Sequence, residues 1–159
     1  MTAPASRPAL LAALYAAFRA GHSAGDHLFQ TDWQARGKAY GAPGWPKALA
    51  VHVAAVHAPI IATVAATIRT TGTRPRTGRL AAALAFNAIT HAVLDTRTPL
   101  VGFMRRTGSA EFADLRLTDT SSRPAWAAGV YAADQAAHEL CLFIAALIAA
   151  SGQKEPRTR

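Results

Sequence analysis

Polar residues interrupt otherwise apolar segments of this chain at a spacing of four. In the first such segment, His22, Asp26 and Gln30 follow an apolar stretch that ends at Phe18. Side chains four residues apart lie on the same face of an α-helix, so the polar stack continues the apolar stripe. We therefore expect these polar side chains to point inward, where each needs a partner because an unpaired buried charge is very costly.

Two later segments repeat this pattern. Asn87, His91 and Asp95 are again four residues apart, and Asp134 precedes His138 by the same spacing. On helices, each of these segments would carry a carboxylate and an imidazole on one face. Three helices are thus expected to bring such a pair to a common interior.

The apolar segments predict an all-α fold, a bundle of four long helices. Alanine and leucine dominate these segments, and both rank high on the helix-propensity scale. The expected helices cover residues 8 to about 33, 46 to about 68, 77–96 and about 122–150, with a polar loop over 97–123 that contains at most a short helix near 112–117. We assign residues 1–7 to a flexible N-terminus, 8–150 to a single helical domain and 151–159 to a disordered basic tail.

One of these helices is apolar enough to suggest a membrane. Residues 48–68 contain no formally charged side chain, and a helix of that length crosses a hydrocarbon core of about 30 Å. Four mostly apolar helices favour a multi-pass protein of the cell membrane. Because the segments are rich in alanine and two of them contain charges, a soluble cytoplasmic bundle is the alternative. The positive-inside rule gives no orientation, since every connection is basic.

The charge balance favours anionic surfaces. Seventeen Lys and Arg residues face nine acids, for a formal net charge of +8, and the basic residues lie mostly between or outside the apolar segments. This arrangement suits membrane lipids with anionic head groups. There is no strong nucleic-acid signal, because no basic run alternates with aromatic residues and no zinc-finger spacing occurs. The single cysteine, Cys141, excludes an internal disulfide and a thiolate zinc site.

The recurring histidines and aspartates are suited to metal binding. Imidazole and carboxylate groups are the usual ligands of zinc and other divalent ions, and helical bundles present them from facing helices. A coordination position left open would hold a water of lowered pKa, ready for hydrolysis of a phosphoester or acyl substrate. The candidate ligands of a divalent metal, zinc above all, are His22, Asp26, His52, His91, Asp95, Asp134 and His138, and Gln30, Asn87 and Gln135 are candidates to orient them. This set exceeds one tetrahedral shell, so either two metals are held or some members orient the others.

Two other functions fit the same residues. A single His/Asp pair on a helix is more often a hydrogen-bonded couple than a metal site, and in a membrane it can relay protons. The second hypothesis is therefore a non-enzymatic membrane protein with a structural polar core or proton path, and bound metal would distinguish it from a metal-dependent hydrolase. A third is a soluble, basic, DNA-associated regulator, which salt-dependent DNA binding would reveal.

The same polar blocks carry a resemblance to a known family. The run Gly21 to Trp33, His52, the block Thr90 to Asp95, and Asp134-Gln135 followed by His138 resemble the bacterial domain of unknown function 3307 family, over about residues 10–148. The order and spacing of all four blocks agree. The resemblance implies a small, mostly helical, multi-pass membrane protein, with motif positions on the residues already selected by spacing, and it names no substrate. The chain is richer in alanine and arginine and less hydrophobic than that pattern.

Overall fold

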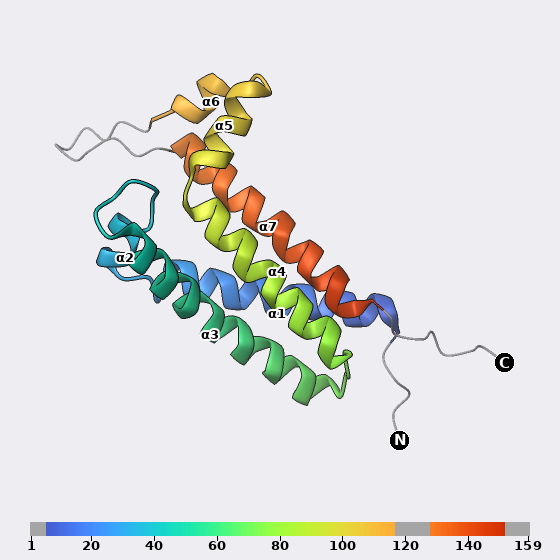
Figure 1. Cartoon of the computed structure of the whole chain (residues 1–159). Coiled ribbons are helices and arrows are strands. Elements are labelled where there is room, and N and C mark those ends of the chain that lie inside the picture. The colour runs from blue at the N-terminus through green and yellow to red at the C-terminus, as the bar shows by residue number, and fades with distance from the viewer. Residues whose placement is uncertain (1–5, 117–127, 152–159) are drawn as a thin grey trace.

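The protein is all-helical, as predicted. The structure is a computed structural model that describes residues 6–116 and 128–151, and no strand occurs in these two ranges. The helices are α1 (Arg7–His27), α2 (Asp32–Gly37), α3 (Trp45–Thr71), α4 (Thr77–Asp95), α5 (Thr98–Arg106), α6 (Ala110–Asp114) and α7 (Ala128–Ala150). Four of them, α1, α3, α4 and α7, are long and form the body of a helical bundle (Figure 1).

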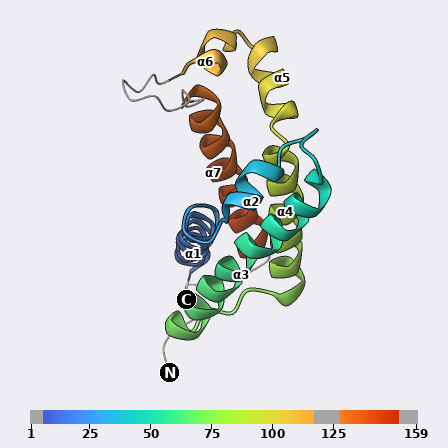
Figure 2. The same ribbon diagram turned by 90° about the vertical axis from the view of Figure 1, so that its left-hand side faces the viewer.

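The directions of the long helices determine where the polar residues meet. α1 packs against α3 and α7, and α4 packs against α7. α1 and α4 run in one direction along the bundle, whereas α3 and α7 run in the other (Figures 1 and 2). Polar residues occupy the last turns of α1 and α4 and the first half of α3 and α7. The antiparallel arrangement therefore brings all four polar segments to the same end of the bundle.

The opposite end of the bundle is apolar. Its core consists of fully or almost fully buried aliphatic and aromatic side chains from all four long helices, among them Leu10, Leu14, Phe18, Val56, Ile60, Val64, Ala83, Leu142, Ala145 and Ala149. In α1 this stripe recurs every three to four residues, as an inward helix face requires. Each long helix thus has one apolar part and one polar part.

Two glycines let α1 and α3 approach closely, and this explains why they are tolerated inside a helix. A Cβ on Gly21 would clash with the backbone of Ile60, and one on Gly25 would lie 2.6 Å from the Cα of Val56. Glycine costs about 1 kcal/mol relative to alanine inside a helix. The close backbone contact at residues 21 and 25 requires it here.

The first predicted helix is wrong in its extent. It was expected to run to about residue 33, but α1 ends at His27 and a separate helix, α2, begins at Asp32. Thr31 and Gln34 form a capping box, in which each side chain bonds the other residue's backbone N–H. The Thr-x-x-Gln pattern was the signal for this second start. Gln30 consequently lies in the connection and does not extend the stack of His22 and Asp26.

The segment after α4 is more ordered than the polar loop expected there. It contains α5 and α6, which form a small second core of Leu100, Met104 and Ala113 against α7. At the N-terminus, Arg7 already belongs to α1, whose cap is Ser6. Residues 1–5, 117–127 and 152–159 lie outside the described ranges. The predicted tail from residue 152 on and the predicted start of the fourth helix near residue 122 therefore also lie outside them.

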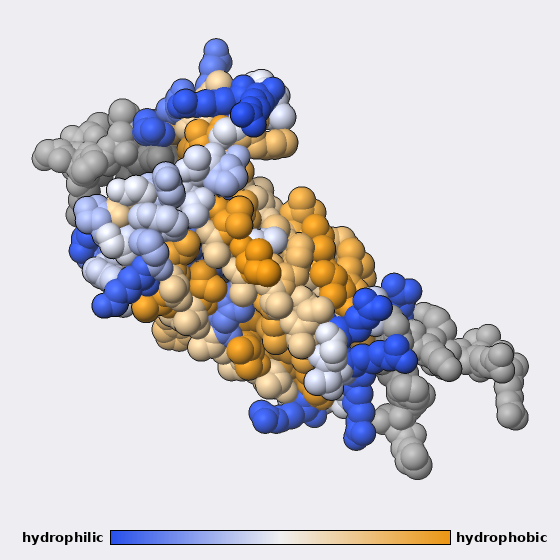
Figure 3. All heavy atoms as spheres, in the orientation of Figure 1, coloured by the Kyte–Doolittle hydropathy of each residue, from blue (hydrophilic) through white to orange (hydrophobic). Residues whose placement is uncertain are grey.

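Two helices, α3 and α7, are long and apolar enough to cross a membrane, by length and composition. Large apolar side chains are exposed along the long helices, among them Ile61, Ile89, Val93, Leu140 and Phe143. In Figure 3, apolar residues gather over the middle of the visible face, and hydrophilic residues lie mainly at its two ends. The surface of this face therefore has an apolar band between two hydrophilic ends (Figure 3).

Candidate metal centre

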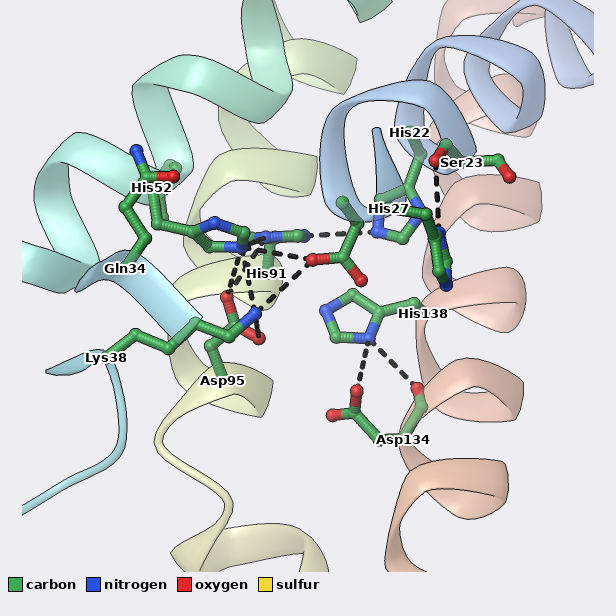
Figure 4. Close-up of polar contacts among 12 residues, drawn as sticks. His22, Ser23, His27, Gln34, Lys38, His52, His91, Asp95, Asp134 and His138 are labelled. Carbon is green, nitrogen blue, oxygen red and sulfur yellow. Dashed lines mark hydrogen bonds and ion pairs between the residues drawn. The ribbon is translucent and has the colours of Figure 1, made fainter. Parts of the chain in front are cut away.

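The polar ends of the four long helices meet in one buried cluster (Figure 4). α1 contributes His22 and Asp26, α3 contributes His52, α4 contributes His91 and Asp95, and α7 contributes Asp134 and His138. All seven are buried except Asp134, which is partly buried. The structure thus brings together every residue that spacing selected as a metal ligand, and the seven come from segments spread over more than a hundred residues of chain.

His52 lies at the centre of the cluster. Its Nε2 is 3.2 Å from Asp26 Oδ1, 3.0 Å from Asp95 Oδ2 and 3.1 Å from His91 Nε2. An imidazole nitrogen carries at most one proton, so it can donate to only one of these groups at a time. The single proton that His52 Nε2 can carry therefore cannot satisfy all three neighbouring acceptor atoms.

Lys38 also reaches into the cluster, and sequence reasoning missed it. Its Nζ lies 2.8 Å from Asp95 Oδ1, 3.3 Å from Asp26 Oδ1 and 3.0 Å from His52 Nε2, and its side chain is 8% exposed. Lys38 caps the carboxyl end of α2. The break between α1 and α2 allows this lysine to point inward. The capping box of Thr31 and Gln34 marks the start of α2, but no spacing in the sequence shows that Lys38 points toward the cluster.

His138 presents an unpaired nitrogen to the cluster. Its Nδ1–H donates to the backbone oxygen of Asp134 at 2.9 Å, which leaves Nε2 with a lone pair in the neutral ring. Nε2 has no hydrogen-bond partner in the part of the chain that the structure describes, and the same holds for Asp134 Oδ1. A ring fixed through one nitrogen and open at the other is the usual arrangement of a metal-ligating histidine.

The rings of His22, His91 and His138 pack against one another at tilted or edge-on angles. His22 Nε2 and His91 Nδ1 are 3.2 Å apart, and the His138 ring centroid is 4.6 Å from that of His91 and 5.0 Å from that of His22. Such close packing is compatible only with mostly neutral rings, because neighbouring positive charges would repel each other.

Burial and the neighbouring charges set the protonation of the α1 and α4 residues. Burial, together with the nearby His91 and His138, lowers the pKa of His22 to about 3. Burial likewise lowers the pKa of His91 to about 4, against the opposing effect of Asp95. Burial alone would raise the pKa of Asp26 and Asp95, but contacts with His52 and the charge of Lys38 outweigh it and hold both carboxyl pKa values well below the usual range. Neutral imidazoles and ionised carboxylates are the ligand forms that metals need.

Three overlapping groups of side chains can hold a metal ion. They are His22/His91/His138, Asp26/His52/His91 and Asp95/Asp134/His138, and in each the ligand atoms lie within 4.8 Å of one another. The last two share no residue. The cluster therefore has room for two cations, and Lys38 already contacts both Asp26 and His52 of the second group.

Of the three residues expected to orient the metal ligands, only Gln135 is described in contact with one of them. Gln135 Nε2 donates to Asp26 Oδ2 at 3.3 Å, in the expected role. Asn87 is buried one turn before His91, and Gln30 lies in the connection after α1. His57, which was not among the candidate residues, also borders the cluster, with its ring edge-on to His91 at a centroid distance of 6.1 Å.

A pocket of about 360 Å³ opens beside the cluster. Asp26, Lys38, Asp95 and Asp134 line its inner side, and Gln30, His27, Arg97, Tyr131 and Gln135 line the rest. His27, on the rim, hydrogen-bonds to the Tyr131 hydroxyl at 2.8 Å. This volume falls within the range of small-molecule sites, so a small substrate can reach Asp95 and Asp134.

Comparisons with protein-family models, with curated proteins and with solved structures found no match. They neither support nor contradict the resemblance to the domain of unknown function 3307 family. The chemistry of the site therefore has to be argued from its own geometry.

Proposed function

We propose that this protein is a metal-dependent hydrolase whose active site is the buried His/Asp cluster. The observation that supports it most is the pair of buried, unpartnered ligand atoms, His138 Nε2 and Asp134 Oδ1, next to a pocket. Buried polar atoms without partners are rare in folded proteins, because each costs about 1–3 kcal/mol. A divalent cation would satisfy both atoms at once.

We assign the ion to Asp95, Asp134 and His138. Both carboxylates of this group line the pocket, so a substrate can approach it. Three protein ligands with an accessible fourth position are typical of hydrolytic zinc sites. A zinc ion there would lower the pKa of a water molecule and polarise the bond to be cleaved.

The other group needs no second metal, because Lys38 supplies a positive charge there. Its ammonium contacts Asp26 Oδ1 and His52 Nε2, two of the three residues that could hold the second ion. Contacts from His52 and His91 meanwhile fix Asp95, which orients one ligand of the metal. The proposed centre thus holds one divalent ion and one lysine.

Metal content tests this proposal. We expect about one equivalent of zinc or another divalent ion per chain by mass spectrometry of the purified protein, and its loss in Asp134→Asn and His138→Gln. The matched control is His27→Gln, which changes a histidine on the same pocket rim outside every candidate group and should keep the metal. If the wild-type protein holds no metal even after reconstitution with several divalent ions, the proposal is wrong.

The ion pairs of Lys38 favour a second candidate function. Lys38 lies between Asp26 and Asp95 and supplies one positive charge to the two carboxylates without any metal. A non-enzymatic protein with a structural polar core or proton path would show this arrangement too. This second function predicts that no metal is bound and that chelators do not change the free energy of unfolding.

We further propose that the protein resides in a membrane, as the resemblance to the domain of unknown function 3307 family implies, and that α3 and α7 cross it. Only 39% of the apolar window of α3 and 28% of that of α7 is buried within the protein. A core helix of a soluble protein would be mostly buried, so these low fractions favour contact with lipid. Recovery of the protein in the membrane fraction after alkaline extraction would support this location, and recovery in the soluble fraction would contradict it.

A further inference from the structure

The rim of the pocket carries an arginine in an unfavourable backbone conformation. Arg97 follows α4 by two residues and has φ 62° and ψ −26°. It is the only residue other than glycine with a positive φ in ranges 6–116 and 128–151. An arginine in this conformation is strained, whereas glycine adopts it freely. Strained residues that persist in a fold concentrate at functional sites, where the side chain is needed.

Arg97 lines two neighbouring pockets. One is the pocket of about 360 Å³ beside the cluster, and the other has about 470 Å³ and is also lined by Tyr40, Thr98 and Arg105. Arg97 thus borders both the pocket next to the proposed metal ligands and the larger neighbouring pocket. Among the described residues, Arg97 makes no ion pair, whereas Arg105 lies 3.6 Å from Asp114.

The charges around the inner pocket favour an anion once the metal is bound. Of its three aspartates, Asp26 and Asp95 contact Lys38 and His52, and Asp95 also belongs with Asp134 to the proposed metal group. The divalent ion, Lys38 and Arg97 then present positive charge to the same chamber. A guanidinium offers paired N–H donors that match two phosphate oxygens, and a divalent ion can take another oxygen.

We infer that the pocket binds the phosphate group of a phosphoester between Arg97, Lys38 and the metal group Asp95/Asp134/His138, with the alcohol part in the outer pocket. This inference rests on the proposed metal site for the hydrolytic step. In that step water forms a bond to phosphorus and the ester P–O bond breaks. One water proton goes to the leaving alcohol oxygen, and the rest of the water stays on the phosphate.

Binding of phenylphosphonate, a phosphoester mimic that is not hydrolysed, tests the inference by calorimetry. The metal content of each sample is measured in parallel. We expect Arg97→Gln to keep the metal and to weaken phenylphosphonate binding about tenfold, the loss expected for a charge-assisted hydrogen bond. Arg97→Gly should weaken it equally while its Tm stays level or rises, because glycine relieves the positive φ. The control Arg106→Gln changes an arginine of α5 that lines neither pocket and should bind as the wild type does.

The outcomes separate this inference from the proposed function. The inference is overturned, with the metal site left intact, if the metal-loaded wild-type protein does not bind phenylphosphonate or binds acetate equally well. It is also overturned if both Arg97 variants bind phenylphosphonate as tightly as the wild type does. A protein without metal that still binds phenylphosphonate through Arg97 would overturn the hydrolase and support the anion pocket. Absence of both metal and phenylphosphonate binding would overturn both.

Discussion

The two ends of the helical bundle are built on the same four helices but differ in what they bury. One end buries apolar side chains, and the other buries histidines and aspartates. At the apolar end, Leu10, Leu14 and Phe18 of α1 pack against aliphatic side chains that need no partner. At the polar end, two turns farther along α1, His22 and Asp26 enter a cluster in which several buried atoms lack a hydrogen-bond partner. The apolar end stabilises the fold by removing apolar area from water, whereas the polar end buries ligand atoms that could hold a metal ion.

This contrast supports our proposal that the function resides at the polar end. Burial of seven histidines and aspartates contributes little to stability, because desolvation offsets their mutual attraction. A packed apolar core would serve the fold better at that end. Under the proposed function, the metal ion explains this arrangement, and the apolar end holds the cluster in place.

The largest effect is expected from removing the internal cation of the polar end. Lys38→Met leaves the buried carboxylates of Asp26 and Asp95 without their cation and should lower the free energy of unfolding of the chelated protein by about 3–5 kcal/mol. Added zinc should restore most of this loss and bind with one more equivalent per chain than in the wild type. Chemical denaturation with and without zinc measures both. Lys47→Met, at an exposed lysine of α3, is the control, and equal stability of the two variants would show that the Lys38 ion pairs do not matter.

A comparable effect is expected where the ends meet, at the α1–α3 contact. Gly21→Ala places a Cβ against the backbone of Ile60, so the helices must separate, and we expect destabilisation of about 3 kcal/mol. Gly78→Ala on α4 meets no atom within 4 Å and should leave stability equal or slightly higher. Thermal unfolding followed by circular dichroism compares the two. A Gly21→Ala protein as stable as the wild type would show that the close approach is not required.

The polar end should also make stability depend on pH. The pKa values of His22 and His91 in the fold, about 3 and about 4, lie below the ordinary 6.5, so the unfolded chain binds more protons than the fold does between these values. Stability is therefore full above pH 6.5 and falls as the pH drops toward 4, by roughly 3 kcal/mol for His91 alone. Denaturation curves of metal-free protein across this range measure the slope. His91→Gln should have a shallower slope, and an unchanged slope would contradict the assignment.

The smallest effect is expected at an exposed ion pair between α1 and α7. Arg19 Nε donates to Glu139 Oε1 at 2.7 Å, but the two side chains are 61% and 37% exposed. Exposed ion pairs contribute about 0–1 kcal/mol, so Glu139→Gln should change the free energy of unfolding by less than 1 kcal/mol. A loss as large as that of Lys38→Met would mean that this pair is shielded from water by a partner or by lipid.

Much of the candidate site could be predicted from the sequence, because helical spacing is local. The spacing of His22 and Asp26, of His91 and Asp95, and of Asp134 and His138 places each pair on one helix face, whatever the rest of the chain does. Lys38 could not be predicted in this way. It enters the cluster only because the chain reverses between α1 and α2, and its inward direction depends on contacts made by distant segments.

The sequence by itself determined the helical class, the paired polar faces and the apolar stretches, since these depend on periods of three to four residues. Only the tertiary structure decided that the four polar segments lie at the same end, that His52 stands between Asp26 and Asp95, and that Arg97 faces the pocket beside them. The physical reason is that helix direction and packing arise from contacts between residues far apart in the chain. No local period records those contacts.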